Sequence, residues 1–283
     1  MSTFIDNMLS IIPDKLYIEL KYFYRFHKFP NLKDPQTYNE KLQWLKLYDR
    51  KPIYTTMADK YEAKKYVADI IGEEYIVKTL GIWNTFEEID FNNLPNQFVL
   101  KCTHDSGGLV ICKDKNTFDL AKTKQIIQNS LNTNYFYHSR EWPYKDIKPR
   151  IIAEEYIENE DGELPDYKFF SFDGETKALY VATDRQTNEE TKFDFYDIEF
   201  NHLDFVNSHP NSTKINKKPK HFEEMIKLAN KLSKGYPHIR VDFYEVKDKI
   251  YFGELTFYHM SGFQPFKPEK WDYTFGEWLK LPK

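Results

Sequence analysis

Apolar residues recur at helical spacing in the first quarter of the chain and again near its end. On this pattern we predict helices over residues 13–29, 37–48, 58–71 and 222–235. The second of these opens with a capping box, Thr37-Tyr-Asn-Glu40, a signature of helix N-termini. The third and fourth run into glycines, the residue most common directly after a helix.

Short apolar runs between turn residues predict strands in the rest of the chain. Residues 98–113 are typical of two strands joined by a polar loop at 103–108, and the Asp-Gly pair at 173–174 predicts a hairpin. A polar helix is expected over 117–131 and a loop over 134–144. Further strands are predicted at 75–83, 151–157, 166–172, 177–183, 238–246 and 250–256. Because strand runs alternate with isolated helices, the predicted fold class is α+β (mixed α/β).

The balance of basic and acidic residues limits which kinds of partner the protein is expected to bind. The 283 residues include 40 basic and 44 acidic side chains, a net charge of −4. Nucleic-acid binding leaves a basic footprint, so this balance argues against a nucleic-acid partner. No apolar run approaches the roughly 18 residues of a membrane span, and the first residues lack a basic start followed by an apolar core. We therefore expect a cytoplasmic protein, whose two cysteines are reduced thiols.

Two features of the composition each allow two interpretations. Aromatic residues make up 17% of the chain, which either AT-rich coding or stacking on sugars explains. Residues 13–29 combine aromatic, aliphatic and basic side chains. Such a helix either packs on the body of the protein or rests on a membrane surface, which would place the protein at the inner face of the membrane.

The predicted hairpin at 238–256 holds the strongest candidate site. With residues 247–249 as its loop, Asp242 faces Glu254 and Arg240 faces Thr256, and strand alternation puts all four on one side of the sheet. Directly opposed carboxylates repel each other, so a cation is expected between them, and oxygen ligands favour Mg²⁺. The alternative is a solvated face with ordinary surface acids, and a register slip of one residue would separate the pair.

A second candidate lies in the loop between the two strands of 98–113. Lys101 precedes the run Ser106, Gly107 and Gly108. Small residues let backbone N–H groups approach an anion, and a lysine adds a point charge suited to phosphate. This is not a Walker A motif, and a plain turn is the alternative. We interpret residues 104–105 as loop residues, because no nucleophile motif accompanies them.

Two further positions carry charge where structure alone does not require it. Lys60 lies at the start of a predicted helix, where a cation is unfavourable against the helix dipole unless a bound anion shares the site. Solvent exposure is the alternative. The predicted strand 151–157 holds Glu154 and Glu155 near its end, which any edge strand could do.

The order of these pieces resembles the ATP-grasp superfamily, and most closely its TupA-like branch, which is associated with bacterial surface-polysaccharide synthesis. A lysine at a helix start is followed by a lysine before Ser-Gly-Gly, then Glu-Glu-Tyr-Ile, Asp-Tyr-Lys, Arg-Val-Asp and Gly-Glu-Leu-Thr. The resemblance covers roughly residues 25 to 280, and its segments are 29–30, 37–49, 58–60, 71–75, 94–104 and 253–258. It implies an ATP-grasp fold, with the nucleotide held between two α+β lobes. The implied organisation is an N-terminal region (1–95), a small lobe with the glycine loop (96–150) and a C-terminal lobe with the Mg²⁺ site (151–283).

The resemblance also implies which residues bind ATP. Two lysines would approach its phosphates, a loop of small residues would cover them, and a strand end would line the adenine. Lys168 matches a position that often contacts nucleotide or substrate. The two lysines are Lys60 and Lys101, and the loop residues are Ser106, Gly107 and Gly108. The residues that would line the adenine are Glu154, Glu155, Tyr156 and Ile157.

Asp242 and Glu254 match the superfamily's Mg²⁺ carboxylates, in agreement with their pairing in the predicted hairpin. Thr256 stands where an asparagine is usual, and its hydroxyl is the expected third metal ligand. Arg240 would guide the acyl carboxylate or phosphate, because its planar fork suits both. Arg240 and Lys101 are the predicted catalytic residues.

These matches imply an ATP- and Mg²⁺-dependent carboxylate–amine ligase that works through an acylphosphate. Its expected substrates are a sugar or glycan-precursor carboxylate and an amino compound. One alternative is a glycosyltransferase or sugar kinase of a polysaccharide pathway. Another is a non-catalytic glycan-binding protein that uses the aromatic surface.

Overall fold

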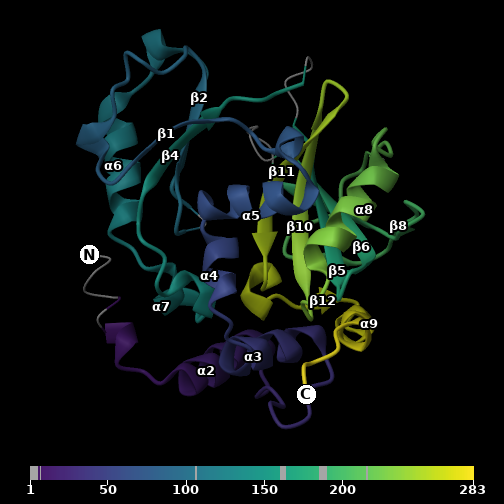
Figure 1. Ribbon diagram of the computed structural model, residues 1–283. Coiled ribbons are helices and arrows are strands. Elements are labelled where there is room, and N and C mark those ends of the chain that lie inside the picture. The colour runs from purple at the N-terminus through teal and green to yellow at the C-terminus, as the bar shows by residue number, and fades with distance from the viewer. Residues whose placement is uncertain (1–5, 7, 106, 160–163, 185–189, 215) are drawn as a thin grey trace. The chain divides into compact units, whose positions relative to one another are not determined.

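The computed structural model describes residues 6, 8–105, 107–159, 164–184, 190–214 and 216–283 (Figure 1). The chain divides into two compact units. Unit 1 comprises Met1–Pro13, Lys51–Tyr66 and Ile76–Ile157, and unit 2 comprises Asp14–Arg50, Val67–Tyr75 and Glu158–Lys283. Within the described residues, no helix has both the length and the apolar character needed to cross a membrane.

Unit 1 is built on an antiparallel sheet whose described strands run in the order β1-β4-β2-β3. Helix α6 covers one face, where Phe98, Leu100 and Cys102 of β2 pack with Ile127. Alternation along β2 therefore turns Val99 and Lys101 to the other face. The strands are β1 (Thr79–Trp83), β2 (Phe98–Cys102), β3 (Leu109–Cys112) and β4 (Ile151–Glu155). The helices are α4 (Ile53–Ala58), α5 (Glu62–Ile71, which continues into unit 2), α6 (Leu120–Leu131) and α7 (Tyr135–Ser139), with 3-10 turns at Phe86–Glu88, Lys115–Thr117 and Trp142–Tyr144.

Unit 2 contains a larger antiparallel sheet, in the order β11-β10-β5-β6-β7-β8, and a small β12-β9 pair. Helix α8 packs on one face of the large sheet through Phe222, whose ring lies 6.0 Å from Phe169 of β5. The strands are β5 (Asp166–Phe172), β6 (Glu175–Thr183), β7 (Lys192–Tyr196), β8 (His202–Leu203), β9 (Val206–Asn207), β10 (Ile239–Val246), β11 (Lys249–Thr256) and β12 (Phe266–Lys267). The helices are α2 (Asp14–Phe26), α3 (Tyr38–Tyr48), α8 (Phe222–Ser233) and α9 (Lys270–Trp278), with 3-10 turns at Glu73–Tyr75 and His259–Gly262.

Most predicted elements are confirmed, including the Thr37 capping box, in which Glu40 N donates to the Thr37 hydroxyl over 3.2 Å. Two predictions of helix and loop boundaries are wrong. The helix expected over 58–71 is interrupted, because the Asp59 carboxylate accepts from Tyr61 N (2.8 Å) and starts α5 anew. The loop expected over 134–144 contains α7 and a 3-10 turn, because Asn134 caps α7 by accepting from Phe136 N over 3.0 Å.

The β10–β11 hairpin has the predicted pairing of Asp242 with Glu254, but its turn and its register near the turn differ from the prediction. Its turn has two residues, Lys247 and Asp248, both with positive φ (49° and 62°), rather than three. That shorter turn shifts the pairing by one residue near the loop. A bulge around Gly253 restores it, so Asp242 pairs with Glu254 as predicted. A Cβ on Gly253 would lie 3.1 Å from the Asp242 carbonyl oxygen, which makes glycine the residue suited to the bulge.

Aromatic side chains fill the second face of the large sheet, around a buried histidine. His238 Nδ1 donates to the Ser171 carbonyl (3.0 Å), and Nε2 accepts from the Tyr38 hydroxyl (2.8 Å). The ring also stacks on Phe172, with 4.8 Å between centroids. Burial lowers the pKa of His238 to about 3. This packing accounts for part of the aromatic excess without any ligand.

This histidine predicts a pH-dependent loss of stability. Below its unfolded-state pKa of about 6.5, His238 binds a proton in the unfolded chain but stays neutral in the folded chain. The free energy of unfolding therefore falls as the pH falls toward the folded-state pKa of about 3. Between pH 7.5 and 5 we expect this group to cost about 2 kcal/mol. Urea unfolding at both pH values should show that His238→Gln loses less unfolding free energy than the wild type when the pH is lowered from 7.5 to 5. Parallel pH profiles would contradict the assignment, and the other histidines cancel in the comparison.

Candidate functional site

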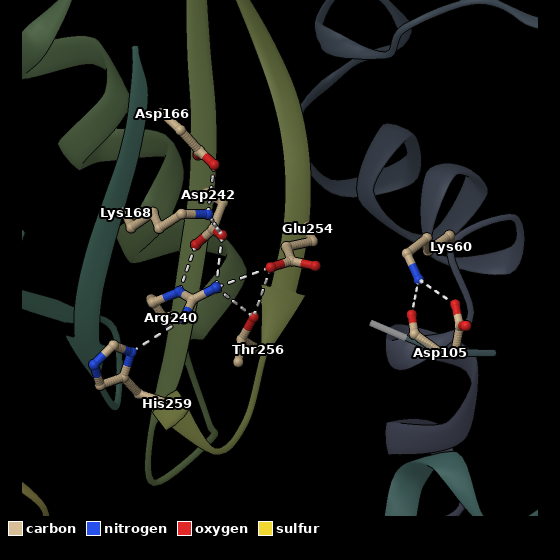
Figure 2. Close-up of polar contacts among 9 residues, drawn as sticks. All are labelled: Lys60, Asp105, Asp166, Lys168, Arg240, Asp242, Glu254, Thr256 and His259. Carbon is tan, nitrogen blue, oxygen red and sulfur yellow. Dashed lines mark hydrogen bonds and ion pairs between the residues drawn. The ribbon is translucent and has the colours of Figure 1, made fainter. Parts of the chain in front are cut away.

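Lys60 is hydrogen-bonded to the loop between β2 and β3, and both belong to unit 1. Its backbone N–H donates to the Thr103 carbonyl over 3.0 Å. Its ammonium group donates to the carbonyls of Cys102 (3.1 Å) and Asp105, and lies 3.8 Å from Asp105 Oδ1 (Figure 2). The structure thus joins Lys60, which lies just before α5, to the loop that also carries the predicted phosphate-binding residues Gly107 and Gly108.

Asp105 organises this loop, a role that sequence reasoning missed. Its carboxylate is buried and accepts from Gly108 N (2.9 Å) and from the Ser130 hydroxyl of α6. A Cβ on Gly108 would lie 2.6 Å from Ser130 Cβ, so no side chain fits there, whereas Gly107 has open space around it. Ser106 lies outside the described residues. The loop is therefore fixed at its Gly108 end.

Lys101 and Glu154 meet on the face of the unit 1 sheet opposite the α6 core. Glu154 stands between two ammonium groups, with 2.5 Å to Lys101 Nζ and 2.5 Å to Lys64 Nζ. Burial acts to raise the pKa of this carboxyl, but the two lysines outweigh it and hold the pKa at about 2. Lys64, from α5, was not predicted, because nothing in the sequence relates it to a strand 90 residues later.

The predicted strand 151–157 ends at Glu155, so the last two residues lie beyond β4. Glu155 is exposed, with its carboxylate 3.4 Å from Lys78 Nζ. Lys113 Nζ lies 5.4 Å from the ring centroid of Tyr156, within the range of a cation–π contact. Ile157 is partly exposed. The adenine-binding role of these residues stays a prediction.

In unit 2, Arg240 occupies the space between the two predicted metal carboxylates (Figure 2). Its Nε and Nη2 donate to Asp242 over 2.8 and 2.7 Å. Nη2 also reaches Glu254 Oε1 and the Thr256 hydroxyl, both at 2.9 Å. The register of β10 and β11 brings all four residues together as predicted. The guanidinium group of Arg240 thus bridges the two carboxylates.

Lys168 and Asp166 extend this cluster onto β5. Lys168 pairs in register with Asp242, and its ammonium group contacts that carboxylate and Asp166 Oδ2, the latter at 2.7 Å. Burial lowers the pKa of Lys168, but the two carboxylates outweigh it and raise the pKa above its usual value. Lys168 is therefore a buried, charged member of the cluster.

His259 supports Arg240 from the turn after β11. Arg240 Nη1 donates to His259 Nδ1 (3.1 Å), and His259 Nε2 donates to Asn207 Oδ1 (2.9 Å). Burial and the nearby guanidinium group hold the pKa of His259 well below its usual value. The ring is thus a neutral tautomer that accepts from the arginine. In the turn that carries His259, Met260 and Ser261 both have positive φ.

The donor chemistry of this cluster fits Mg²⁺. The carboxylates of Asp242 and Glu254 and the hydroxyl of Thr256 are the hard oxygen donors that this ion prefers. The part of the chain that the structure describes holds no group of three or more His, Cys, Asp or Glu residues arranged for a metal. The predicted metal site therefore stays a prediction that rests on two carboxylates and a hydroxyl.

The family comparison identifies the chain as an ATP-grasp protein. The family model of TupA-like ATP-grasp proteins matches residues 40–280, and the chain belongs to this family. No curated protein sequence matches the chain.

Several solved structures are similar in part. D-alanine–D-alanine ligase from Bacillus anthracis is 16% identical, with 71% of this chain and 57% of that chain covered and a TM-score of 0.42. The ligase of the same name from Helicobacter pylori is 15% identical, with 86% and 69% covered and a TM-score of 0.44. The ATP-grasp ligase PsnB, complexed with a minimal precursor, is 11% identical, with 73% and 54% covered and a TM-score of 0.42. The chain spans little more than half the length of the first and third of these proteins.

Proposed function

We propose that this protein is an ATP- and Mg²⁺-dependent ligase that joins an amino compound to a sugar carboxylate in bacterial surface-polysaccharide biosynthesis. The observation that carries the proposal is the placement of Asp242 opposite Glu254 around the Arg240 guanidinium group, in a member of the TupA-like ATP-grasp family. Two facing carboxylates and a planar cation are suited to holding a metal and an anionic substrate together.

The residues of unit 1 would bind ATP. Lys60 and Lys101 carry the positive charge that phosphates need. Gly107, with open space around it, offers a backbone N–H group that can approach an anion, and Ser106 would complete the loop over the phosphates. Gly108 would hold that loop in place, because its N–H donates to Asp105. The segment Glu154–Ile157 would line the adenine. When phosphate binds, Lys101 would share its ammonium group between Glu154 and the phosphate.

The residues of unit 2 would hold the metal and the carboxylate substrate. Asp242, Glu254 and Thr256 would supply oxygen ligands to Mg²⁺, which when bound neutralises charge on the phosphates. Arg240 would turn part of its fork toward the substrate carboxylate while His259 keeps one edge of the guanidinium group in place. Lys168 would contact nucleotide or substrate and keep Asp242 ionised.

The proposed reaction has two steps. A carboxylate oxygen attacks the γ-phosphorus, the bond to the β,γ-bridging oxygen breaks, and ADP leaves an acylphosphate behind. The amine nitrogen then attacks the acyl carbon, inorganic phosphate departs with its C–O bond electrons, and the amine loses a proton to form the amide. Arg240, Lys60 and Lys101 would stabilise the negative charge of the transferred group, and the glycine loop would exclude water from the acylphosphate.

The test is a reaction with Mg-ATP, pooled uronic acids and pooled amino compounds, followed by mass spectrometry for the condensed product and for ADP. We expect both products only when carboxylate and amine are present together. Glu254→Gln should abolish them, because it removes a charged metal ligand whose side chain is 43% exposed. Glu175→Gln is the matched control, since Glu175 is an exposed acid on the same sheet.

Other outcomes distinguish the alternatives. A stable phosphorylated sugar formed without any amine would identify a sugar kinase. Binding of UDP-sugars without ATP would identify a glycosyltransferase. Glycan binding with no nucleotide binding, unchanged by loss of Lys60 and Lys101, would identify a non-catalytic protein. Each of these results would overturn the ligase proposal.

A further inference from the structure

Helix α2 leaves a stripe of large apolar side chains exposed. Leu16, Leu20, Phe23 and Tyr24 are between 44% and 77% exposed. Their spacing of four, three and one residues places them on one side of a helix with 3.6 residues per turn. Phe29, 61% exposed, lies just beyond the helix and stacks on Phe23 with 4.9 Å between ring centroids. We call these five residues the α2 stripe.

The opposite side of α2 is anchored to unit 2. Ile18 and Tyr22 are fully buried and pack with Phe263. Arg25 Nε donates to the Phe263 carbonyl over 3.1 Å, and Arg25 Nη2 donates to Gln264 Oε1 over 2.7 Å. The stripe therefore faces outward on a helix that is held in place, and local unfolding is not needed to expose it.

Cations border the α2 stripe. At 100° per residue, Lys15 lies on one side of it, next to Glu19, and Lys21 lies on the other side. The Lys21 ammonium group lies 5.0 Å from the ring centroid of Phe263, and Lys28 follows the helix end. Lys15 pairs with Glu19 at 3.8 Å and Lys28 with Glu269 at 2.8 Å, both at exposed positions, where ion pairs are weak and easily exchanged. Long lysine side chains can lie along apolar surface and keep their charge in the polar layer beside it.

We propose that the α2 stripe docks unit 2 onto an anionic membrane surface, with the helix lying in the interface between headgroups and acyl chains. Aliphatic and aromatic side chains between flanking lysines match both the apolar and the anionic chemistry of such a surface. A second copy of the chain fits less well, because a two-fold contact through the stripe would bring the same lysines toward one another. This inference goes beyond the proposed function and does not depend on it.

The test is co-sedimentation of the full chain, without nucleotide, with vesicles of phosphatidylcholine alone or mixed with phosphatidylglycerol. We expect binding to the mixed vesicles only. Leu20→Glu combined with Phe23→Glu should reduce it by about tenfold or more, since it replaces buried apolar area with charge. Lys15→Gln should reduce it by about fivefold, the contribution of one basic residue near the surface. Leu120→Glu and Ile198→Glu are matched controls, because both residues are comparably exposed and neither belongs to the α2 stripe.

Three results would overturn the proposal. The first is equal binding by the stripe variant and the controls, and the second is no binding by the wild type. The third is a wild-type dimer in light scattering that the stripe variant converts to monomer, which would make a second copy the occupant. Thermal unfolding of each variant checks that it folds. Because no nucleotide is present, failure of the ligase proposal leaves this result unchanged.

Discussion

Glu154→Gln is expected to lower the free energy of unfolding by about 3 kcal/mol or more, the usual cost of removing one partner from a buried ion pair. The amide keeps the size of the side chain, so the change is mainly one of charge. Lys64 and Lys101 are then left near each other without a carboxylate between them, in side chains that are only 12% and 23% exposed. Urea unfolding at pH 7 measures the effect.

The neighbouring residue provides the control for this change. Glu155 pairs with Lys78 at 3.4 Å, and both side chains are exposed, so Glu155→Gln should cost no more than about 1 kcal/mol. The contribution of Glu154 is fully present above its unfolded pKa of about 4.5 and disappears as pH falls through its folded pKa of about 2. Equal losses for the two variants at pH 7, or an undiminished difference at low pH, would contradict the ion-pair assignment.

The unit 2 cluster could be predicted because it depends on short-range rules. Arg240 and Asp242 share a face by strand alternation, and Glu254 and Thr256 follow from the hairpin register. The predicted three-residue loop was nevertheless wrong, and a two-residue turn alone would have offset Asp242 from Glu254. The bulge around Gly253 compensates for that turn. A single glycine in the strand was visible in the sequence, and a glycine inside a strand is a signal for a bulge.

The contacts that sequence reasoning missed are long-range. Lys64 contacts Glu154, and His259 contacts Asn207, across 90 and 52 positions of the chain. Neither spacing corresponds to a helix or hairpin period, so no local rule relates these residues. Local rules also do not predict the bridging contacts of Arg240. Strand pairing predicts that the two carboxylates face each other, but only the side-chain geometry shows that Arg240 bridges them.

The bridging role of Arg240 predicts a large loss of activity when its planar fork is removed. Arg240→Lys keeps the positive charge and removes the planar fork. A single ammonium group cannot reproduce the paired contacts to Asp242 together with those to Glu254 and His259. Under the proposed function, we expect the rate of ADP release to fall by about 10²–10³-fold, as for loss of one preorganised group that stabilises transition-state charge.

Three measurements separate this role from a structural one. Mg-ATP should still stabilise Arg240→Lys against heat, because the proposed phosphate-binding lysines lie in unit 1. The KM for the carboxylate substrate should rise while the KM for ATP changes little. Arg50→Lys is the matched control, because Arg50 also donates to a carboxylate, that of Asp14 at 2.8 Å, but at a more exposed position away from the cluster. Wild-type activity in Arg240→Lys, alongside inactive Glu254→Gln, would show that the arginine only neutralises the carboxylates and does not orient the substrate.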